Sequence, residues 1–94
     1  MCLGIPGMVS RSEVGDRDFV EVEIASIRRM VHIGMLADSP IAVGDWLLIH
    51  VGFAIAKLPE SEALSTIDFQ ARSGKDYREE LDAFASLMEG EDRI

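Results

Sequence analysis

Cysteine is nearly absent from this sequence: the 94 residues contain a single one, Cys2. One thiol cannot form an internal disulfide, so the chain lacks the covalent cross-links that stabilise many small secreted proteins. The first residues also lack a positively charged segment followed by an apolar stretch, and no secretory signal is recognised there. Together these absences predict a cytoplasmic protein.

Long hydrophobic runs and basic residues are scarce as well. The longest apolar stretch, WLLIHVGFAIA at 46–56, is interrupted by His50 and is too short to cross a bilayer. Nine Lys and Arg residues stand against seventeen Asp and Glu residues, which gives a net charge of −8. Because nucleic-acid binding depends on Lys and Arg side chains that neutralise phosphates, we expect neither a nucleic acid nor a membrane as a partner.

The signatures of self-sufficient enzymes are missing too. The sequence contains no CxxC pair, no Gly-rich phosphate-binding loop, no HExxH motif and no Ser–His–Asp order. A length of 94 residues allows one domain with a modest core, spanning 1–94. These features predict a small protein that is not an enzyme.

What is present up to residue 58 is the pattern of β-strands. In FVEVEIASI at 19–27, Val20, Val22 and Ile24 alternate with acidic residues, as a half-buried strand requires. Three further strands are expected, at 8–14, 28–36 and 46–58. Several short strands rich in Val, Ile and Gly predict a small β-barrel formed by residues 1–58.

Two of these expected strands have distinctive patterns. The strand at 28–36 places Arg29, Val31, Ile33 and Met35 on one side, which leaves His32 as a surface or edge residue. The strand at 46–58 is apolar on both faces. It is therefore predicted to be one long strand in the centre of the sheet.

After Pro59 the period changes to that of helices. A C-terminal helical segment is predicted at 59–89, divided at Gly74 and followed by a frayed tail at 90–94. Helical spacing assigns the apolar residues to one face of each helix: Leu64, Ile67 and Ala71 in the first, and Tyr77, Leu81, Phe84 and Met88 in the second.

Cys2 is the first candidate for chemistry. A free cysteine is most often a small buried hydrophobe, but a residue at the end of a chain seldom reaches a core. Removal of Met1 would leave Cys2 with both an α-amino group and a thiol. Such a group can bind a soft metal or act as a nucleophile.

His50 is the second candidate, although a histidine in an apolar strand is more often a hydrogen-bonded core residue than a ligand. Alternation places His50 on the same side as Trp46, Leu48 and Gly52, and Gly52 leaves space beside it. Imidazole and thiolate together suit iron, zinc or copper. Two ligands leave a site incomplete, so any metal would need further ligands from a cofactor or a partner.

Two motifs carry a resemblance to a known family. The start, MCLGIPG, fits the pattern Met-Cys, small apolar residue, Gly, apolar residue, Pro, and GDWLLIHVGFA at 44–54 fits a Gly-Asp-Trp/Tyr-Val-Leu-Val-His-Val-Gly-Phe-Ala block. Glu62 and Ala63 match the Glu-Ala pair at the head of the family's C-terminal helix. With these motifs at the right separation, the chain from Met1 to about Phe69 resembles the HypC/HupF family of [NiFe]-hydrogenase maturation chaperones.

The resemblance implies a fold and a task. The fold is mainly β, a small OB-like β-barrel with a C-terminal α-helical segment. The task is that of an accessory chaperone that works with a HypD-like scaffold protein to assemble the Fe(CN)2CO group. The chaperone then delivers this iron group to the precursor of the hydrogenase large subunit.

The resemblance also implies roles for individual residues. The family's essential cysteine, exposed when the initiator methionine is removed, matches Cys2, and the histidine of the second motif matches His50. Iron is then bound transiently by Cys2 and His50 and shared with the partner. Gly4, Pro6, Gly52 and Phe53 are supporting motif residues. We expect Gly4 and Pro6 to lie at the stiff root of a mobile N-terminal arm.

One departure from the family pattern concerns a turn or strand edge. Ala25-Ser26-Ile27 stands where relatives have a glycine at the middle position, and the loss of this glycine is expected to alter the local backbone.

Two other functions are weighed against the chaperone. A small thiol-dependent enzyme would use Cys2 as nucleophile and His50 as base, but the sequence shows no third group to orient the histidine and no substrate-binding motif. A plain interaction module, with an incidental cysteine, is the other alternative.

Overall fold

Five strands and two helices make up the computed structural model, which describes residues 4–12, 17–36 and 38–87. The strands form a closed barrel in the order β1 (Ile5–Arg11), β2 (Phe19–Ile24), β3 (Ile27–His32), β5 (Phe53–Leu58) and β4 (Trp46–His50). All neighbours are antiparallel except β3 and β5, which pair in parallel.

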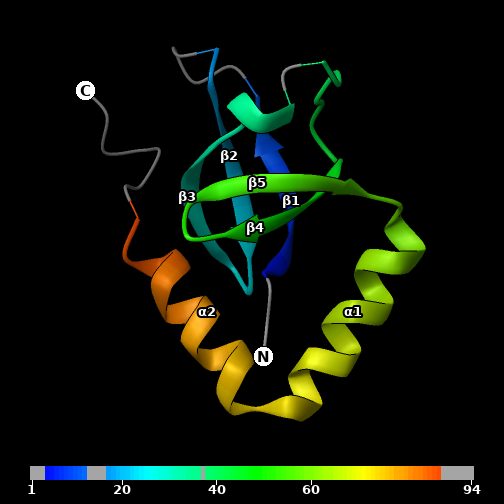
Figure 1. The fold of residues 1–94 in the computed structure, drawn as a ribbon, viewed down its shortest axis with the longest axis vertical. Coiled ribbons are helices and arrows are strands. Elements are labelled where there is room, and N and C mark those ends of the chain that lie inside the picture. Colours follow the sequence, from blue (N-terminus) through cyan, green and yellow to red (C-terminus); the bar gives the residue numbers. More distant parts are fainter. Residues whose placement is uncertain (1–3, 13–16, 37, 88–94) are drawn as a thin grey trace.

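Two helices follow the barrel, α1 (Glu60–Ser73) and α2 (Lys75–Ala85), and together they form a V at one end of it (Figure 1). A short 3-10 helix, η1 (Gly34–Leu36), follows β3. This architecture confirms the prediction of a mainly β fold with a C-terminal helical segment, whereas the likeness to the OB fold stays a prediction. Within the described residues, neither helix has the length and apolar character that a membrane span requires.

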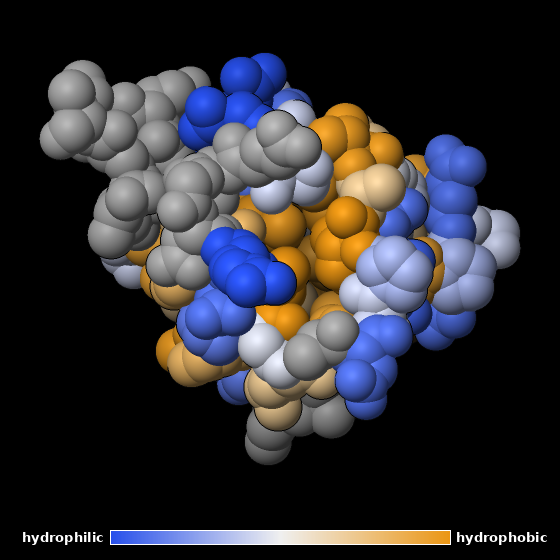
Figure 2. Space-filling model, turned by 90° about the horizontal axis from the view of Figure 1, so that it is seen from above, coloured by the Kyte–Doolittle hydropathy of each residue, from blue (hydrophilic) through white to orange (hydrophobic). Residues whose placement is uncertain are grey.

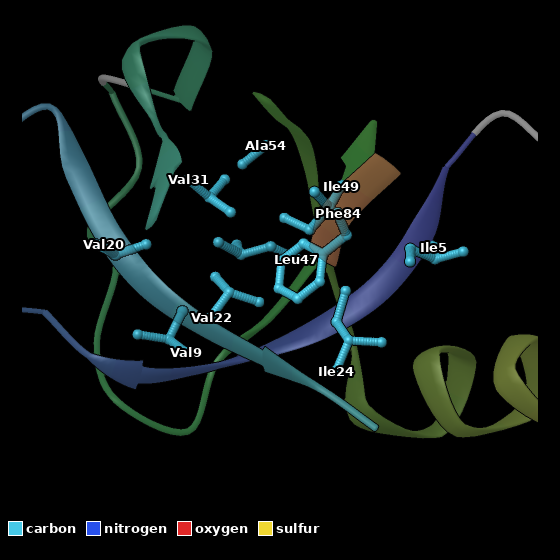
Figure 3. Close-up of a cluster of buried hydrophobic side chains, with 10 residues drawn as sticks. All are labelled: Ile5, Val9, Val20, Val22, Ile24, Val31, Leu47, Ile49, Ala54 and Phe84. Atoms are coloured by element: carbon cyan, nitrogen blue, oxygen red, sulfur yellow. The ribbon is translucent and has the colours of Figure 1, made fainter. Parts of the chain in front are cut away.

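Strand alternation predicted the inward residues of β2 correctly. Val20, Val22 and Ile24 of β2 are buried, and they pack with apolar side chains from the other four strands (Figure 3). Phe84 of α2 joins the same cluster, so a helix contributes directly to the barrel core. Glu21, on the opposite face of β2, is also buried, and its carboxylate accepts a hydrogen bond from Ser10 Oγ at 2.9 Å.

The prediction of one long strand at 46–58 is wrong, because the chain reverses in the middle of this apolar run. His50 and Phe53 are paired across a two-residue turn formed by Val51 and Gly52, whose φ angles are 49° and 83°. Two consecutive positive φ angles match the right-handed twist of a hairpin. The sequence does not indicate this turn, because a β-branched residue such as Val51 rarely adopts a positive φ.

Two other strand boundaries differ from the predictions. β1 begins at Ile5 and not at residue 8, so Pro6, which was predicted at the stiff root of an arm, is a buried strand residue. β3 ends at His32, and η1 then turns the chain so that Met35 is exposed. His32 is half-buried between two rings: its centroid lies 5.0 Å from that of Phe19 and 5.6 Å from that of Phe53.

Both predicted helices are observed, and the assignment of buried faces is confirmed for α2 but is correct only for the half-buried Ile67 on α1. The break at Gly74 is confirmed, and Tyr77, Leu81 and Phe84 pack toward the barrel. Met88 and the tail at 90–94 lie outside the described residues. On α1, in contrast, Leu64 and Ala71 are exposed and Ala63 is the buried residue. Helical periodicity alone cannot choose between two faces when the helix touches the barrel over a narrow strip.

The glycine lost from the family pattern maps to the turn between β2 and β3. Ile24 pairs with Ile27, which leaves Ala25 and Ser26 as a two-residue loop with φ angles of 51° and 70°. The second position of such a turn strongly favours glycine. The position is therefore a turn, and the effect of the substitution on the turn stays a prediction.

Replacing Ser26 by glycine is expected to raise the free energy of unfolding by about 0.5–1 kcal/mol, because glycine adopts a positive φ without a Cβ clash. Urea denaturation of the two proteins measures the difference. The same substitution at Ser86, where φ is −84°, serves as the control and is expected to lower stability. A Ser26→Gly protein no more stable than the parent would show that the turn carries no strain.

Candidate functional site

His50 is the last residue of β4 and lies on the outer face of the barrel. Leu47 and Ile49 are buried, and Trp46, Leu48 and His50 alternate with them and are partly exposed. The predicted sharing of one face by these three residues is therefore confirmed. The side chain of His50 is 43% exposed, so it is a surface residue and not a core histidine.

A carboxylate from α2 contacts the imidazole of His50. Nδ1 of His50 lies 3.0 Å from Oε2 of Glu80, a hydrogen-bonding distance, and the Glu80 side chain is only 14% exposed. A carboxylate is an acceptor, so a neutral imidazole donates its Nδ1–H in this pair. The contact makes α2 part of the surroundings of His50.

The turn after His50 contains Gly52 and leads into Phe53. The carbonyl oxygen of Gly52 accepts a hydrogen bond from the backbone N–H of His32 at 2.9 Å, which ties the turn to β3. A Cβ at Gly52 would lie 3.2 Å from Leu87 Cδ2. Gly52 is thus a turn residue against the end of the helical segment, which corrects the prediction that it leaves space on the strand face. Phe53 is 47% exposed beside this turn.

The start of β1 lies next to the end of β4. Ile5 pairs with Ile49 and Pro6 with Leu48, so Gly4 is held beside the residues that precede His50. Gly4 has a φ of 134°, and a Cβ there would lie 2.8 Å from the carbonyl oxygen of Ile49. Only glycine fits so close an approach of two backbones.

A side chain of α1 also holds this root of the N-terminal segment. Nε2 of Gln70 donates a hydrogen bond to the carbonyl oxygen of Gly4 at 2.8 Å. Each helix therefore contacts one part of the candidate site: α1 contacts Gly4 and α2 contacts His50. The predicted stiff root exists, but paired strands and Gln70 stiffen it in addition to Pro6.

Cys2 lies outside the described residues. Among the residues that the structure does describe, no group of three or more His, Cys, Asp or Glu side chains is arranged to hold a metal ion. His50 and Glu80 form a pair within this part of the chain. The structure thus brings together His50, Gly52, Phe53, Gly4 and Pro6 around one end of the β1–β4 pair.

A hollow opens at the end of the barrel remote from the V of the helices. Figure 2 looks onto this end and shows apolar atoms surrounded by polar ones. The hollow is lined by apolar side chains that include Val20, Ile33, Leu36 and Ile41. Arg17 and Asp18 are among its polar lining residues. Among the described residues, none of the predicted site residues lines the hollow, and no imidazole does.

Sequence reasoning missed Glu80 and Gln70. Glu80 is one of several acidic residues on α2, and only its helical position distinguishes it: it lies three residues after Tyr77 and four before Phe84, on the edge of the buried stripe. Glu79, its neighbour, is exposed. That spacing is the one signal that could have marked Glu80 as facing the barrel. No comparable signal marks Gln70.

Comparisons with known proteins agree with the two motifs. The profile of the HupF/HypC family matches residues 1–69. The hydrogenase maturation factor HypC of Rhodobacter capsulatus is 33% identical over 92 residues, which cover 96% of this chain and 92% of the relative. The hydrogenase maturation factor HybG of Escherichia coli K12 is 37% identical over 70 residues, covering 72% and 85% of the two chains. HypC of Azotobacter chroococcum mcd 1 is 37% identical over 75 residues, covering 80% and 84%.

Proposed function

Because the chain belongs to the HupF/HypC family, we propose that it is a hydrogenase maturation factor, as its relatives in Rhodobacter and Escherichia are named. It works in the cytoplasm with a HypD-like scaffold protein to assemble the Fe(CN)2CO group, and it delivers this group to the precursor of the hydrogenase large subunit. Cys2 and His50 contact the iron, and the scaffold contributes the other ligands. The iron group is cargo, and the protein itself catalyses no reaction.

The pairing of β1 with β4 is the observation that carries this proposal. Ile5 is opposite Ile49, and Gly4 is fixed beside it by Gln70, so the N-terminal segment starts from a defined point next to His50. Cys2 is two residues from Gly4, and two residues of extended chain span at most about 7 Å. This short covalent tether favours a thiol and an imidazole that act on the same iron.

The chemistry of the two side chains supports iron as the cargo. A thiolate and an imidazole are ligands for iron, and two ligands from one protein leave other coordination positions for a second protein or for small ligands. A carrier needs such an incomplete site, because it must release the metal to the next protein. The exposure of the His50 ring leaves it accessible to a partner.

Anaerobic affinity purification from the source organism tests the proposal, with the parent protein beside Cys2→Ala. We expect the parent to lack Met1, to carry iron, and to bring a scaffold protein and a large-subunit precursor with it. Cys2→Ala is expected to keep its thermal stability, because the barrel is built from residue 5 onward, but to lose the iron or the precursor. Intact mass, iron content and the masses of the co-purified proteins are measured.

The two histidines provide a matched control in the same experiment. His50→Ala is expected to lose iron, whereas His32→Ala should retain it, because the ring of His32 packs between those of Phe19 and Phe53. If parent and Cys2→Ala both emerge alone and free of iron, or with the same partners and iron, the proposed function is wrong.

The position of Glu80 favours one alternative function, that of a thiol-dependent enzyme. A thiol-dependent enzyme with Cys2 as nucleophile and His50 as base requires a third group that orients the histidine, and the sequence alone showed none. Glu80 lies in that position. Turnover of a small thioester or ester by the isolated protein, lost in Cys2→Ser, would establish this alternative. We expect no such turnover.

A further inference from the structure

The contact between His50 and Glu80 joins two parts of the chain that are 30 residues apart. The carboxylate approaches Nδ1 and not Nε2, and the Glu80 side chain is mostly buried while the imidazole is partly exposed. Glu79, the next residue on the same helix, is exposed. The helix therefore directs one of two adjacent carboxylates at the ring.

The position of Glu80 is fixed by packing on both sides of it. Phe84, one helical turn further on, is buried in the barrel core, and Tyr77 and Leu81 pack against the same core. At the end of α2, the Nε of Arg29 donates a hydrogen bond to the carbonyl oxygen of Ala85 at 2.8 Å. A cation at a helix C-terminus is favourable, so this contact also holds α2 against β3.

A fixed carboxylate at Nδ1 selects one form of the neutral imidazole. The ring carries its proton on Nδ1 or on Nε2, and a hydrogen bond from Nδ1–H to a carboxylate favours the first form. In that form Nε2 holds a free lone pair on the opposite side of the ring. Histidines that bind metals are commonly oriented in this way by a carboxylate on the other nitrogen.

We propose that Glu80 is a positioning residue for the iron-binding role of His50: it holds the proton on Nδ1 and thereby presents Nε2 to the metal. This inference rests on the proposed function for the identity of the metal, but the choice of tautomer exists in the metal-free protein. It assigns a task to α2, which lies beyond the residues 1–69 matched by the family profile.

The tautomer can be measured directly by two-bond 15N–1H correlation spectra of the metal-free protein at alkaline pH. We expect His50 of the parent protein to be protonated mainly on Nδ1. In Glu80→Ala the proton is expected to move mainly to Nε2, the form that an unrestrained imidazole prefers. Glu79→Ala is the matched control, and its His50 spectrum is expected to equal that of the parent.

Glu80→Gln separates hydrogen bonding from charge. The glutamine side chain has nearly the same shape, and its carbonyl oxygen can still accept the Nδ1–H hydrogen bond. This variant is expected to keep the parent tautomer, and the backbone amide spectrum of Glu80→Ala checks separately that this protein is folded. A parent protein protonated mainly on Nε2, an unchanged tautomer in Glu80→Ala, or an equal change in Glu79→Ala would overturn the inference.

Iron retention provides the second readout. In the anaerobically purified complex, the chelator concentration that removes half of the iron is expected to fall about 10- to 100-fold in Glu80→Ala and to stay unchanged in Glu79→Ala. If the parent complex holds no iron while the tautomer changes as expected, the proposed function fails and the positioning contact stands. If iron is present but its retention is equal in all variants, the positioning role fails alone.

Discussion

Replacing Phe84 by alanine is expected to lower the free energy of unfolding by about 3–5 kcal/mol, the range for a buried aromatic residue truncated to alanine. Phe84 is 2% exposed and packs with the strand residues of the barrel core, although it belongs to α2 (Figure 3). Its removal would leave a cavity where the helix meets the barrel. Equilibrium denaturation in guanidinium chloride measures the loss.

Phe69 offers the same substitution on the other helix. Its side chain is 70% exposed on α1, so Phe69→Ala is expected to change the free energy of unfolding by less than about 1 kcal/mol. Equal effects of the two substitutions would mean that α2 contributes no more to the core than an exposed helix does. The position of Glu80 beside His50 would then lose its structural basis, because Phe84 is the buried residue that anchors this helix.

Replacing Gly7 by alanine is expected to lower the free energy of unfolding by about 1–3 kcal/mol, the usual range for overpacking a core. Gly7 is a buried residue of β1, and a Cβ added there would overlap Val22 Cγ1 and lie 2.8 Å from Ile24 Cγ1. Both neighbours are buried in β2 and have little room to move. The midpoint and slope of a urea denaturation curve measure the effect.

A double-mutant cycle with Val22→Ala tests the cause. The smaller side chain makes room for the new methyl group, so Gly7→Ala is expected to cost less in the Val22→Ala background than in the parent protein. Equal costs in both backgrounds would show that the methyl group does not meet Val22. The destabilisation would then have to come from the backbone of β1.

The inward side chains of a strand could be predicted where apolar and polar residues alternate along that strand. Val20, Val22 and Ile24 are the inward residues of β2, as the sequence predicted, because successive side chains of a strand point to opposite faces. The same reasoning gave a wrong prediction for the apolar run 46–58, which forms a hairpin and not one strand. Its turn is formed by Val51, which resembles a strand residue, and only the pairing of His50 with Phe53 identifies the hairpin.

The helices illustrate the same limit. Tyr77, Leu81 and Phe84 formed a clear stripe, and they do pack against the barrel. On α1 the predicted stripe is wrong for Leu64, which is exposed, whereas the small Ala63 beside it is buried. A helix that touches the barrel over a narrow area needs little apolar surface, so its pattern carries little information.

The sequence by itself determined the family, through the motifs around Cys2 and His50, and the alternating β pattern of the barrel. It also identified the two side chains whose chemistry suits a metal. Only the tertiary structure decided that Glu80 faces Nδ1 of His50 and that Gln70 holds Gly4. The physical reason is distance along the chain. Periodicity reports the neighbours of a residue within one strand or helix, whereas a hydrogen bond across 30 or 66 positions depends on how the elements pack.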